Sequence, residues 1–508
     1  RAKIFSANYL PSSTYTKSFI LNANHQLDVV LLTTDPENFF NEDTGIYVFG
    51  PAGTYETKEP YFGANFWEDW ERPIHIAFYE SEDATFAEFN AGVKIFGGWS
   101  RGQNEQRSLA LFARGQYGDS KFEHAFFNQL NYTEFQALVL RNSGQDWMKS
   151  SMKDIMLTSL MRGAGLDFQE HTPVATYLNG DYWGLYNLRE KVNEHMLASK
   201  HNIDADDITI LEFNGSKVEG SNAEYLQLRS YIRNTDLTID SNFEYVEQEI
   251  DLEEYALYQA TQIYVNNTDW PGNNIEYWKR KDGKWQWLLI DTDAALGDPY
   301  YNMLEHTTTT EGMPFENPEW STLILRSLLT NTSFKERFIN RYMQLINEEF
   351  NYNKIMPLID KYARLYYPEV SNQTNRWGFP SSTTDFANGV SDLHYFFKNR
   401  PCMVKQQLED FFDTTLAIDV CEDNPITDGG ISPNPNNGDF LIHYFSNKAI
   451  SASIRIHDLS GKLLFEKEIQ LMKGYHSYPV DVQFLNSGLY ITSIYSDKKL
   501  WQRKTIKL

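Results

Sequence analysis

The segment 266–297 constrains the fold most, because two short apolar strands lie on either side of an Asp-Gly pair. Asp282 and Gly283 are a strong hairpin signal, since the residues of a two-residue loop must tolerate positive φ. With these two residues as the loop, counting outward predicts that Trp278 faces Trp287. The chain is therefore expected to contain an antiparallel ribbon whose register is set by its turn.

Four oxygen-bearing side chains are predicted to lie at one end of this ribbon: Asp269, Asn274, Asp291 and Asp293. The predicted register places Asn274 opposite Asp291. Carboxylate and amide oxygens gathered at one point suit a hard cation such as Mg²⁺, with phosphate completing its ligands. An Asp, an Asn five residues later, a hairpin and a second Asp is also the order of catalytic and metal-binding residues in protein kinases. The alternative is that these residues only flank strands as turn residues.

Two other segments have a composition that suits phosphate binding. Segment 96–114 reads as a strand, a Gly-rich basic turn and a second strand, which would place backbone N–H groups over phosphates and project Arg101 or Arg107 toward them. Glu190 is predicted to open a helix after a buried strand, where it would pair with a phosphate-binding cation. The alternatives are an ordinary turn for the first segment and a first-turn Glu favoured by the helix dipole for the second.

The length and charge of the chain limit its domains and its partners. At 508 residues the chain exceeds one compact core, so two or three domains are expected. A net charge of −24 repels nucleic acid and anionic membranes, so neither is expected as a partner. No apolar run approaches the roughly 18 to 20 residues that span a bilayer, so no transmembrane segment is expected. Cys402 and Cys421 either form a disulfide in an oxidising compartment or are free thiols.

Three motifs carry a resemblance to a known family. They read YLNGDYWGLYNLREKVNEHML, VNNTDWPGNNIEYWK and LLIDTDAALG, and they occur in that order along the chain. Together they resemble the CotH kinase family, which is named for a spore-coat protein, over roughly residues 27–412. The resemblance implies a protein-kinase-like fold and ATP-dependent phosphorylation of secreted or surface proteins.

The resemblance also assigns roles to individual residues. Asp269 corresponds to the catalytic Asp, while Asn274 and Asp291 would hold Mg²⁺ or Mn²⁺. Asp293 would be a second-metal or supporting carboxylate. These assignments agree with the metal site that the hairpin predicts.

On the phosphate side the resemblance assigns Glu190 as the helix acid that orients the phosphate-binding cation. Many family members have Lys before a Ser in the corresponding strand, whereas this chain has Arg107 before Ser108. Arg keeps the charge but forks and reaches differently, so the change is not conservative. Lys94, on the preceding predicted strand, is the alternative cation.

The C-terminal region resembles a second family through ISPNPNNGDFLIHY, IRIHDLSGKLL and LNSGLYITSI. These motifs are similar to the C-terminal sorting domain of the type IX secretion system of Bacteroidetes. The resemblance implies export by the outer-membrane secretion machinery and a secreted or outer-surface location. The alternative is an unrelated small β-sandwich, which the short alternating runs also fit.

The expected fold class is α+β, with a protein-kinase-like domain of a mixed-sheet lobe and a helical lobe, followed by a small all-β sandwich. The expected boundaries are 1–25 for the remnant of a preceding β domain, 26–415 for the CotH kinase-like domain, 416–432 for a linker, and 433–508 for the sorting domain.

The leading functional hypothesis is a phosphotransferase that moves a phosphoryl group from Mg-ATP to a protein or peptide hydroxyl. A second hypothesis is a surface binding or adhesion protein for protein or glycan, which the aromatic content of 15% suits. A third treats the Asp-Thr-Asp motif as the metal site of a nucleotide-sugar glycosyltransferase. That hypothesis expects a nucleotide-binding βα alternation that the N-terminal sequence lacks.

Overall fold

The computed structural model describes residues 1–12, 14–20, 25–81, 86–310, 316–417, 426–446, 449–472, 474–496 and 499–508. It divides into two units, Arg1–Leu393 and His394–Leu508, and the division lies inside the long helix α13 (Thr383–Phe412). Helices and several sheets confirm the predicted mixed α+β class. The two-lobe kinase-like arrangement and the domain boundary at residue 415 stay predictions.

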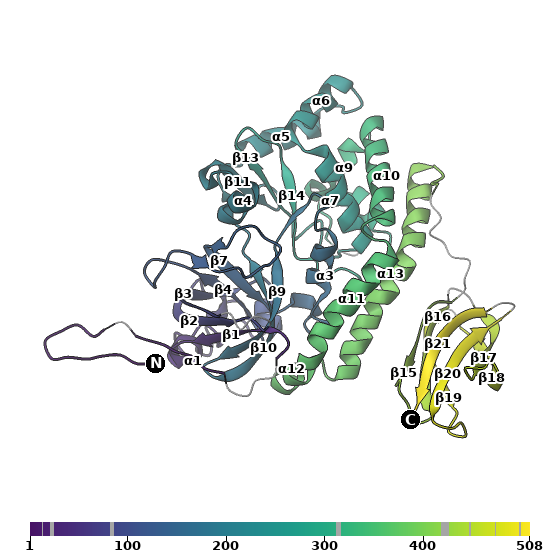
Figure 1. Cartoon of the computed structure of the whole chain (residues 1–508). Coiled ribbons are helices and arrows are strands. Elements are labelled where there is room, and N and C mark those ends of the chain that lie inside the picture. The colour runs from purple at the N-terminus through teal and green to yellow at the C-terminus, as the bar shows by residue number, and fades with distance from the viewer. Residues whose placement is uncertain are drawn as a thin grey trace. The chain divides into compact units, whose positions relative to one another are not determined.

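A closed barrel of seven strands forms one part of the first unit (Figure 1). Parallel pairing of β1 with β9 closes the barrel, and the other neighbours pair antiparallel. Apolar side chains such as Val93, Leu109 and Leu140 fill its core and are fully buried. In barrel order the strands are β1 (Asp28–Thr33), β2 (Arg72–Tyr79), β3 (Phe86–Phe96), β4 (Ser108–Phe112), β7 (Ala137–Arg141), β10 (Asp181–Glu190) and β9 (His171–Leu178).

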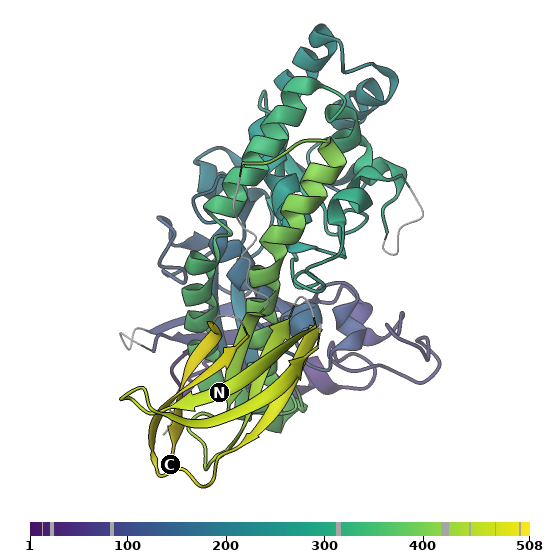
Figure 2. The ribbon, with the colours of Figure 1, turned by 90° about the vertical axis from the view of Figure 1, so that its right-hand side faces the viewer.

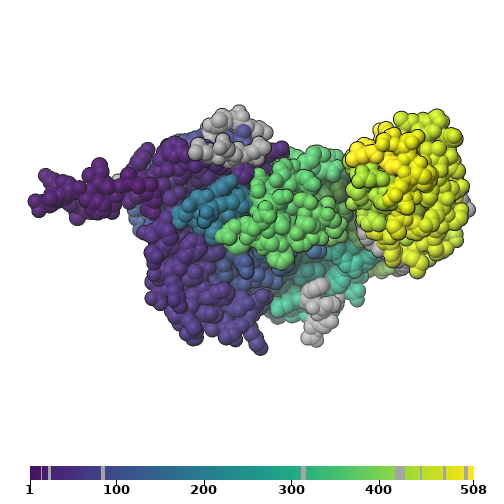
Figure 3. Space-filling view, turned by 90° about the horizontal axis from the view of Figure 1, so that it is seen from below, coloured from purple at the N-terminus to yellow at the C-terminus, as the bar shows by residue number. Residues whose placement is uncertain are grey.

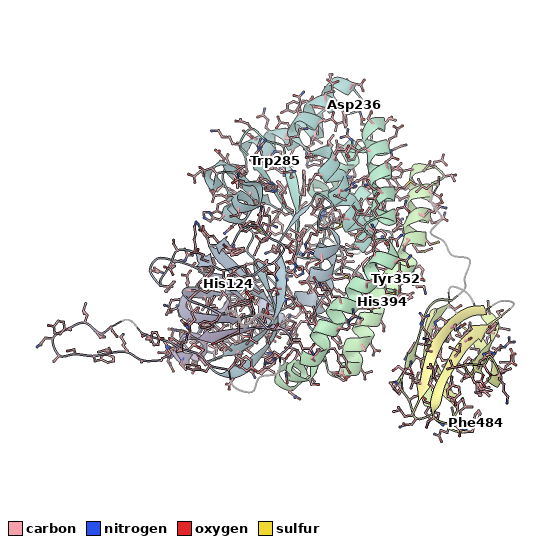
Figure 4. All side chains as sticks on the ribbon, viewed as in Figure 1. His124, Asp236, Trp285, Tyr352, His394 and Phe484 are labelled. Atoms are coloured by element: carbon pink, nitrogen blue, oxygen red, sulfur yellow. The ribbon has the colours of Figure 1, made fainter. Side chains whose placement is uncertain are left out.

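A second sheet of five strands carries the predicted hairpin. Trp285, labelled in Figure 4, is fully buried in this region and contacts Tyr225 of α5 (Ala223–Asn234) with ring centroids 5.3 Å apart. Helix α7 (Leu252–Val265) packs against β14 (Gln286–Leu289) and α10 (Thr332–Asn347), so nearly all of its residues are buried. In sheet order the strands are β12 (Ser216–Glu219), β11 (Ile208–Glu212), β13 (Glu276–Arg280), β14 (Gln286–Leu289) and β8 (Asp167–Phe168).

The hairpin exists, but its predicted register is wrong by one residue. Trp278 pairs with Gln286 rather than with Trp287. The turn hydrogen bond runs from the Gly283 N–H to the Arg280 carbonyl at 2.9 Å, and only Asp282 has positive φ, at 57°. The loop therefore has three residues instead of two, which shifts every pair outward by one.

Long helices of the first unit bury apolar residues that lie three and four apart in the sequence. In α10, Phe334, Phe338, Tyr342 and Leu345 form one buried face. The helices are α1 (Pro36–Phe40), α2 (Ser100–Gln103), α3 (Lys153–Leu160), α4 (Glu194–His201), α5 (Ala223–Asn234), α6 (Asp240–Glu249), α7 (Leu252–Val265), α8 (Met303–Thr308), α9 (Glu319–Leu328), α10 (Thr332–Asn347), α11 (Tyr352–Tyr366) and α12 (Val370–Trp377). The first unit also contains short 3-10 turns and a two-stranded sheet. The turns are Asn65–Trp67, Gly144–Asp146, Ala205–Asp207 and Tyr367–Glu369, and the two strands are β5 (Phe122–Glu123) and β6 (Glu134–Phe135).

The N-terminal residues form an extended arm beside the barrel. One backbone bridge joins Ala2 to Tyr15, and Phe5, Tyr9 and Leu10 are more than 70% exposed. Figure 3 shows this arm in dark purple, projecting from the first unit. The hypothesis that it is the remnant of a preceding β domain stays a prediction.

The second unit carries a two-sheet sandwich, whose strands are drawn in yellow and yellow-green in Figure 2. Ile442 from one sheet and Ile454 and Ile494 from the other share one core. The first sheet is β15 (Ile426–Ser432), β16 (Asp439–Ser446) and β19 (Gly474–Asp481). The second is β18 (Leu463–Leu471), β17 (Ile450–His457), β20 (Gly488–Tyr495) and β21 (Lys499–Lys507).

Two sequence predictions concern the connection before this sandwich. Strand β15 begins at Ile426, within the segment 416–432 that was predicted as a linker. Cys402 is disulfide-bonded, which agrees with the first of the two cysteine alternatives. Cys421 lies outside the described residues.

Candidate active site

The acidic turn, residues Asp291, Thr292 and Asp293, directly follows the end of β14. Asp291 has φ of 48°, a left-handed conformation that turns the chain away from the strand. Both carboxylates accept hydrogen bonds from the same nitrogen, Nη2 of Arg141 at the end of β7, with 2.6 Å to Oδ2 of Asp293. The oxygens of Asp291 and Asp293 therefore converge on one point.

Thr292 anchors the acidic turn to buried charges behind it. Oδ1 of Asp154 in α3 accepts hydrogen bonds from the Thr292 N–H at 2.8 Å and from its hydroxyl at 2.6 Å. Asp154 also forms an ion pair with Arg189 of β10, whose side chain is 2% exposed. Helix α3 and strand β10 thus fix the position of the turn.

Burial and crowding shift the pKa values of these groups. Burial raises the pKa of Asp293 well above its usual value, and the neighbouring Asp291 carboxylate raises it further. Burial opposes ionisation of Asp154 as well, but Arg189 and Arg141 outweigh it and hold the pKa of Asp154 low. Burial disfavours the charged form of Arg141, yet the three carboxylates around it leave its pKa raised.

Asp269 lies on the loop after α7, which ends at Asn266 in a left-handed conformation. Asn273 donates to its Oδ1 at 3.2 Å, and Asn274 donates to its Oδ2 at 2.9 Å. Burial raises the pKa of Asp269, the Asn273 hydrogen bond opposes that, and Asp291 adds to the rise. The structure therefore joins Asp269 to Asn274 and brings Asp291 within electrostatic range of Asp269.

The donor set fits Mg²⁺ or Mn²⁺ held together with phosphate. Mg²⁺ is commonly bound by one or two carboxylates plus substrate phosphates and water, rather than by a cage made only of protein. The convergent carboxylates of Asp291 and Asp293 match that pattern, and the Oδ1 of Asn274 makes no hydrogen bond to the described residues. Within the described ranges, no group of three or more His, Cys, Asp or Glu side chains is arranged to hold a metal.

The structure places Arg107 in a pocket of aromatic rings. Its guanidinium lies 4.0 Å from the ring centroid of Phe66 and 5.1 Å from that of Tyr47. Nη1 donates to the Glu105 carbonyl at 3.2 Å, and burial lowers the pKa of Arg107. No described carboxylate forms an ion pair with it, and its assignment to the phosphates stays a prediction.

Glu190 is not on a helix, which corrects the predicted helix acid. It is the last residue of β10, and its N–H continues the sheet by donating to the Glu170 carbonyl at 3.1 Å, so helix α4 begins only at Glu194. The carboxylate of Glu190 pairs with Lys200 at 3.0 Å and accepts a hydrogen bond from Tyr132. Glu190 therefore pairs with Lys200 in the structure, and its role beside a phosphate-binding cation stays a prediction.

Lys94 and Lys191 carry positive charge on the barrel side of the site and lie within electrostatic range of each other. Lys94 forms an ion pair with Asp69 at 2.8 Å. Burial lowers the pKa of Lys191, Glu276 raises it, and Lys94 lowers it further, so these three groups lie within electrostatic range. Glu276 is also within range of Asp291, and its own pKa is raised to about 7, first by burial and then by Glu212.

Sequence reasoning missed Arg141, Asp154, Arg189 and Lys191. One feature of the sequence could have identified the two arginines, because each is a basic residue within or at the end of an apolar run. Arg141 ends the apolar run Ala137–Leu140, and Arg189 lies in a run of eight buried residues. A buried charge needs a partner, which predicts an acid nearby but does not name it.

Comparisons with known proteins give two results. A family model described as CotH kinase protein matches residues 93–404, more than half of the chain. A second, described as secretion system C-terminal sorting domain, matches residues 430–508. No curated protein matches the chain.

The sorting domain shows that the protein is secreted or located at the outer cell surface, and that it engages a secretion machinery. None of the helices in the described part of the chain has the length and apolarity that a bilayer crossing demands.

Proposed function

Because the chain belongs to the CotH kinase family, we propose that it transfers a phosphoryl group from Mg-ATP to a hydroxyl of a protein or peptide outside the cell. The observation that supports this most directly is the pairing of Asp269 with Asn274 beside the convergent carboxylates of Asp291 and Asp293. Phosphoryl transfer requires a positioned nucleophile and stabilised phosphate charge more than covalent chemistry by the protein.

Asp269 would orient the acceptor hydroxyl and accept its proton. Two amide N–H groups, from Asn273 and Asn274, fix its two oxygens. Its raised pKa moves it toward the range in which a carboxylate accepts protons efficiently near neutral pH. A base held this way needs little reorganisation when the hydroxyl arrives.

Asp291, Asp293 and the amide oxygen of Asn274 would hold the metal. The bound Mg²⁺ or Mn²⁺ would neutralise charge on the phosphates as the phosphoryl group leaves ATP. Thr292 and Asp154 keep the two carboxylates facing the same point, so the chain supplies the orientation.

The positive charge for the polyphosphate has several candidates on the barrel side. The family resemblance assigns Arg107, with Glu190 as its partner and Lys94 as the alternative. The electrostatic link from Lys94 through Lys191 and Glu276 to Asp291 favours the two lysines. We therefore propose Lys94 and Lys191 as groups that attract the phosphates.

Calorimetry with Mg-ATP tests the proposal. The wild-type protein should bind Mg-ATP, Asp291→Ala should abolish binding, and Asp269→Asn should keep binding while reducing transfer by roughly 10²- to 10⁴-fold. Asp240→Asn, at an exposed position of α6, is the matched control and should change neither quantity. Absence of binding at millimolar nucleotide by a protein with native circular dichroism would refute the proposal.

A second candidate function rests on exposed aromatic side chains. Trp99 is 58% exposed and Phe62 is 46% exposed, and their ring centroids lie 6.3 Å apart in a T-shaped arrangement. Exposed aromatic groups of this kind bind protein or glycan partners. Adhesion without catalysis predicts a glycan-array or protein-binding signal that Trp99→Ala removes, together with no phosphoryl transfer.

A further inference from the structure

Arg141 occupies the point where the metal-binding oxygens of the acidic turn converge. A single nitrogen, Nη2, contacts both Asp291 and Asp293. The Arg141 side chain is 14% exposed, that of Asp293 is 3% exposed and that of Asp291 is 31% exposed, so the contact is shielded from water on the Asp293 side. A single cation therefore already pairs with both carboxylates.

Two arginines serve the acidic turn, and their attachments differ. Arg189 forms a close ion pair with Asp154, which in turn fixes Thr292. Arg141 approaches Asp154 only at 4.0 Å through Nε, and this buried Nε makes no hydrogen bond within the described part of the chain. Each arginine is held mainly through one nitrogen, since Nε and Nη2 of Arg189 also make no hydrogen bond among the described residues. Arg141 contacts the carboxylates of the turn directly, whereas Arg189 acts on the turn only through Asp154.

We propose that Arg141 occupies the metal position in the metal-free protein and that metal enters only by displacing its guanidinium. The proposal rests on the proposed function for the identity of the metal site. Displacement alone is unfavourable, because it separates a buried cation from two carboxylates. Nucleotide phosphates supply the displaced guanidinium with a new anionic partner, so metal and nucleotide bind together better than either binds alone.

This arrangement makes Arg141 a positioning residue that couples the two ligands. Without nucleotide it keeps the carboxylates paired and ordered, and it keeps free divalent cations out. With nucleotide it moves from the carboxylates to the phosphates. The consequence is selectivity for the metal–nucleotide complex over the free metal, which matters for a protein outside the cell.

The test measures Mn²⁺ binding without nucleotide, by electron paramagnetic resonance of free Mn²⁺. Arg141→Met should bind Mn²⁺ at least tenfold tighter than the wild-type protein, because no guanidinium has to leave. A non-hydrolysable ATP analogue should strengthen Mn²⁺ binding by the wild type, and this strengthening should be several-fold smaller in Arg141→Met. Arg162→Met is the matched control. It removes the ion pair between Arg162, which follows α3, and Glu170, and it should leave both the Mn²⁺ affinity and its increase with nucleotide unchanged.

Arg141→Lys covers the case in which Arg141→Met fails to fold. A lysine keeps the charge but, being shorter and without a fork, releases one carboxylate, so it should also bind free Mn²⁺ tighter than wild type. Affinities equal to or weaker than wild type in the folded variants would overturn the inference.

The two proposals fail in different ways. Tighter Mn²⁺ binding by the variants without any nucleotide binding would support the displacement of Arg141 by metal, but it would refute both the coupling to nucleotide and the phosphotransferase. Nucleotide binding by the wild type with unchanged Mn²⁺ affinity in the variants would refute the displacement of Arg141 and leave the phosphotransferase standing.

Discussion

The acidic turn and the glycine-rich turn, residues 97–102, each follow a strand of the first unit and each looked functional in the sequence. In the acidic turn Asp293 is buried, Asp291 is 31% exposed, and both pair with Arg141, while Asp154 behind them pairs with Arg189. In the glycine-rich turn, a Cβ on Gly98 would meet nothing within 4 Å, and Trp99 is 58% exposed.

The difference shows what a local pattern does and does not determine. Glycines make a turn possible, but they do not fix where its backbone N–H groups point. Buried charges fix their neighbours because each group left unpaired costs several kcal/mol, roughly 3 to 5 for one partner of a buried ion pair. The acidic turn is therefore the better-defined half of the candidate site.

The largest expected effect is on the free energy of unfolding, and it differs between two buried arginines, Arg189 and Arg107. Arg189→Met leaves Asp154 without its close partner, so we expect the free energy of unfolding to fall by about 3–5 kcal/mol. Arg107→Met loses a hydrogen bond to a carbonyl but keeps its packing against Tyr47 and Phe66, so about 1 kcal/mol is expected. Urea unfolding followed by tryptophan fluorescence measures both, and equal losses would contradict the comparison.

The same Arg107→Met protein tests the assignment that the family resemblance gives to this residue. If Arg107 reaches the phosphates, Mg-ATP affinity should fall by tenfold or more, at roughly 1.4 kcal/mol per factor of ten. If it only fills the aromatic pocket, affinity should not change, and Lys191→Met should lower it instead. Calorimetry under the conditions used for Asp291→Ala decides between these outcomes.

A smaller difference in stability is expected between alanine variants of two glycines, Gly144 and Gly98. Gly144 has φ of 50°, and a Cβ there would approach the Oδ2 of Asp293 to 1.9 Å, so the backbone lies directly against that carboxylate. Gly144→Ala should destabilise the protein by roughly 1–3 kcal/mol and weaken metal–nucleotide binding. Gly98→Ala, with open space around its Cβ, is the control and should do neither. Equal melting temperatures for the two variants would show that the acidic turn adapts freely.

Much of the fold followed from local sequence. An Asn-Gly pair favours a tight hairpin turn, and Asn179-Gly180 forms the turn between β9 and β10 with positive φ at both residues, at 52° and 98°. Apolar residues three and four apart favour a helix, and the structure has helices at α7 and after Thr322 where the sequence has that spacing. These features depend on neighbours within a few residues, which periodicity and turn chemistry report directly.

The sequence predictions were wrong where contacts between residues far apart in the sequence determine the local structure. The hairpin register depended on whether Lys281 belongs to the loop, and its N–H donates to the Asp207 carbonyl of a neighbouring segment. Glu190 stays in a strand because β7 and the Glu170 backbone pair with it. No pattern around residue 291 names Arg141, which lies 150 residues away in the sequence.

The smallest expected effect concerns Glu276, which lies within electrostatic range of both Asp291 and Lys191. Its pKa is raised from 4.5 to about 7, by burial first and then by Glu212, which faces it across the strands. The folded protein therefore holds this proton up to about pH 7, while the unfolded chain releases it near pH 4.5. The free energy of unfolding therefore falls as pH rises through that interval. The loss is at most about 3 kcal/mol, and partial exposure of Glu276 to solvent makes it smaller.

Glu276→Gln should consequently match the wild type in thermal unfolding at pH 4.5 and exceed it by about 1–2 kcal/mol at pH 8. Glu244→Gln, at an exposed position of α6, is the matched control and should show no such pH dependence. A gain of the same size at both pH values would mean that burial of the side chain, rather than its ionisation, accounts for the change.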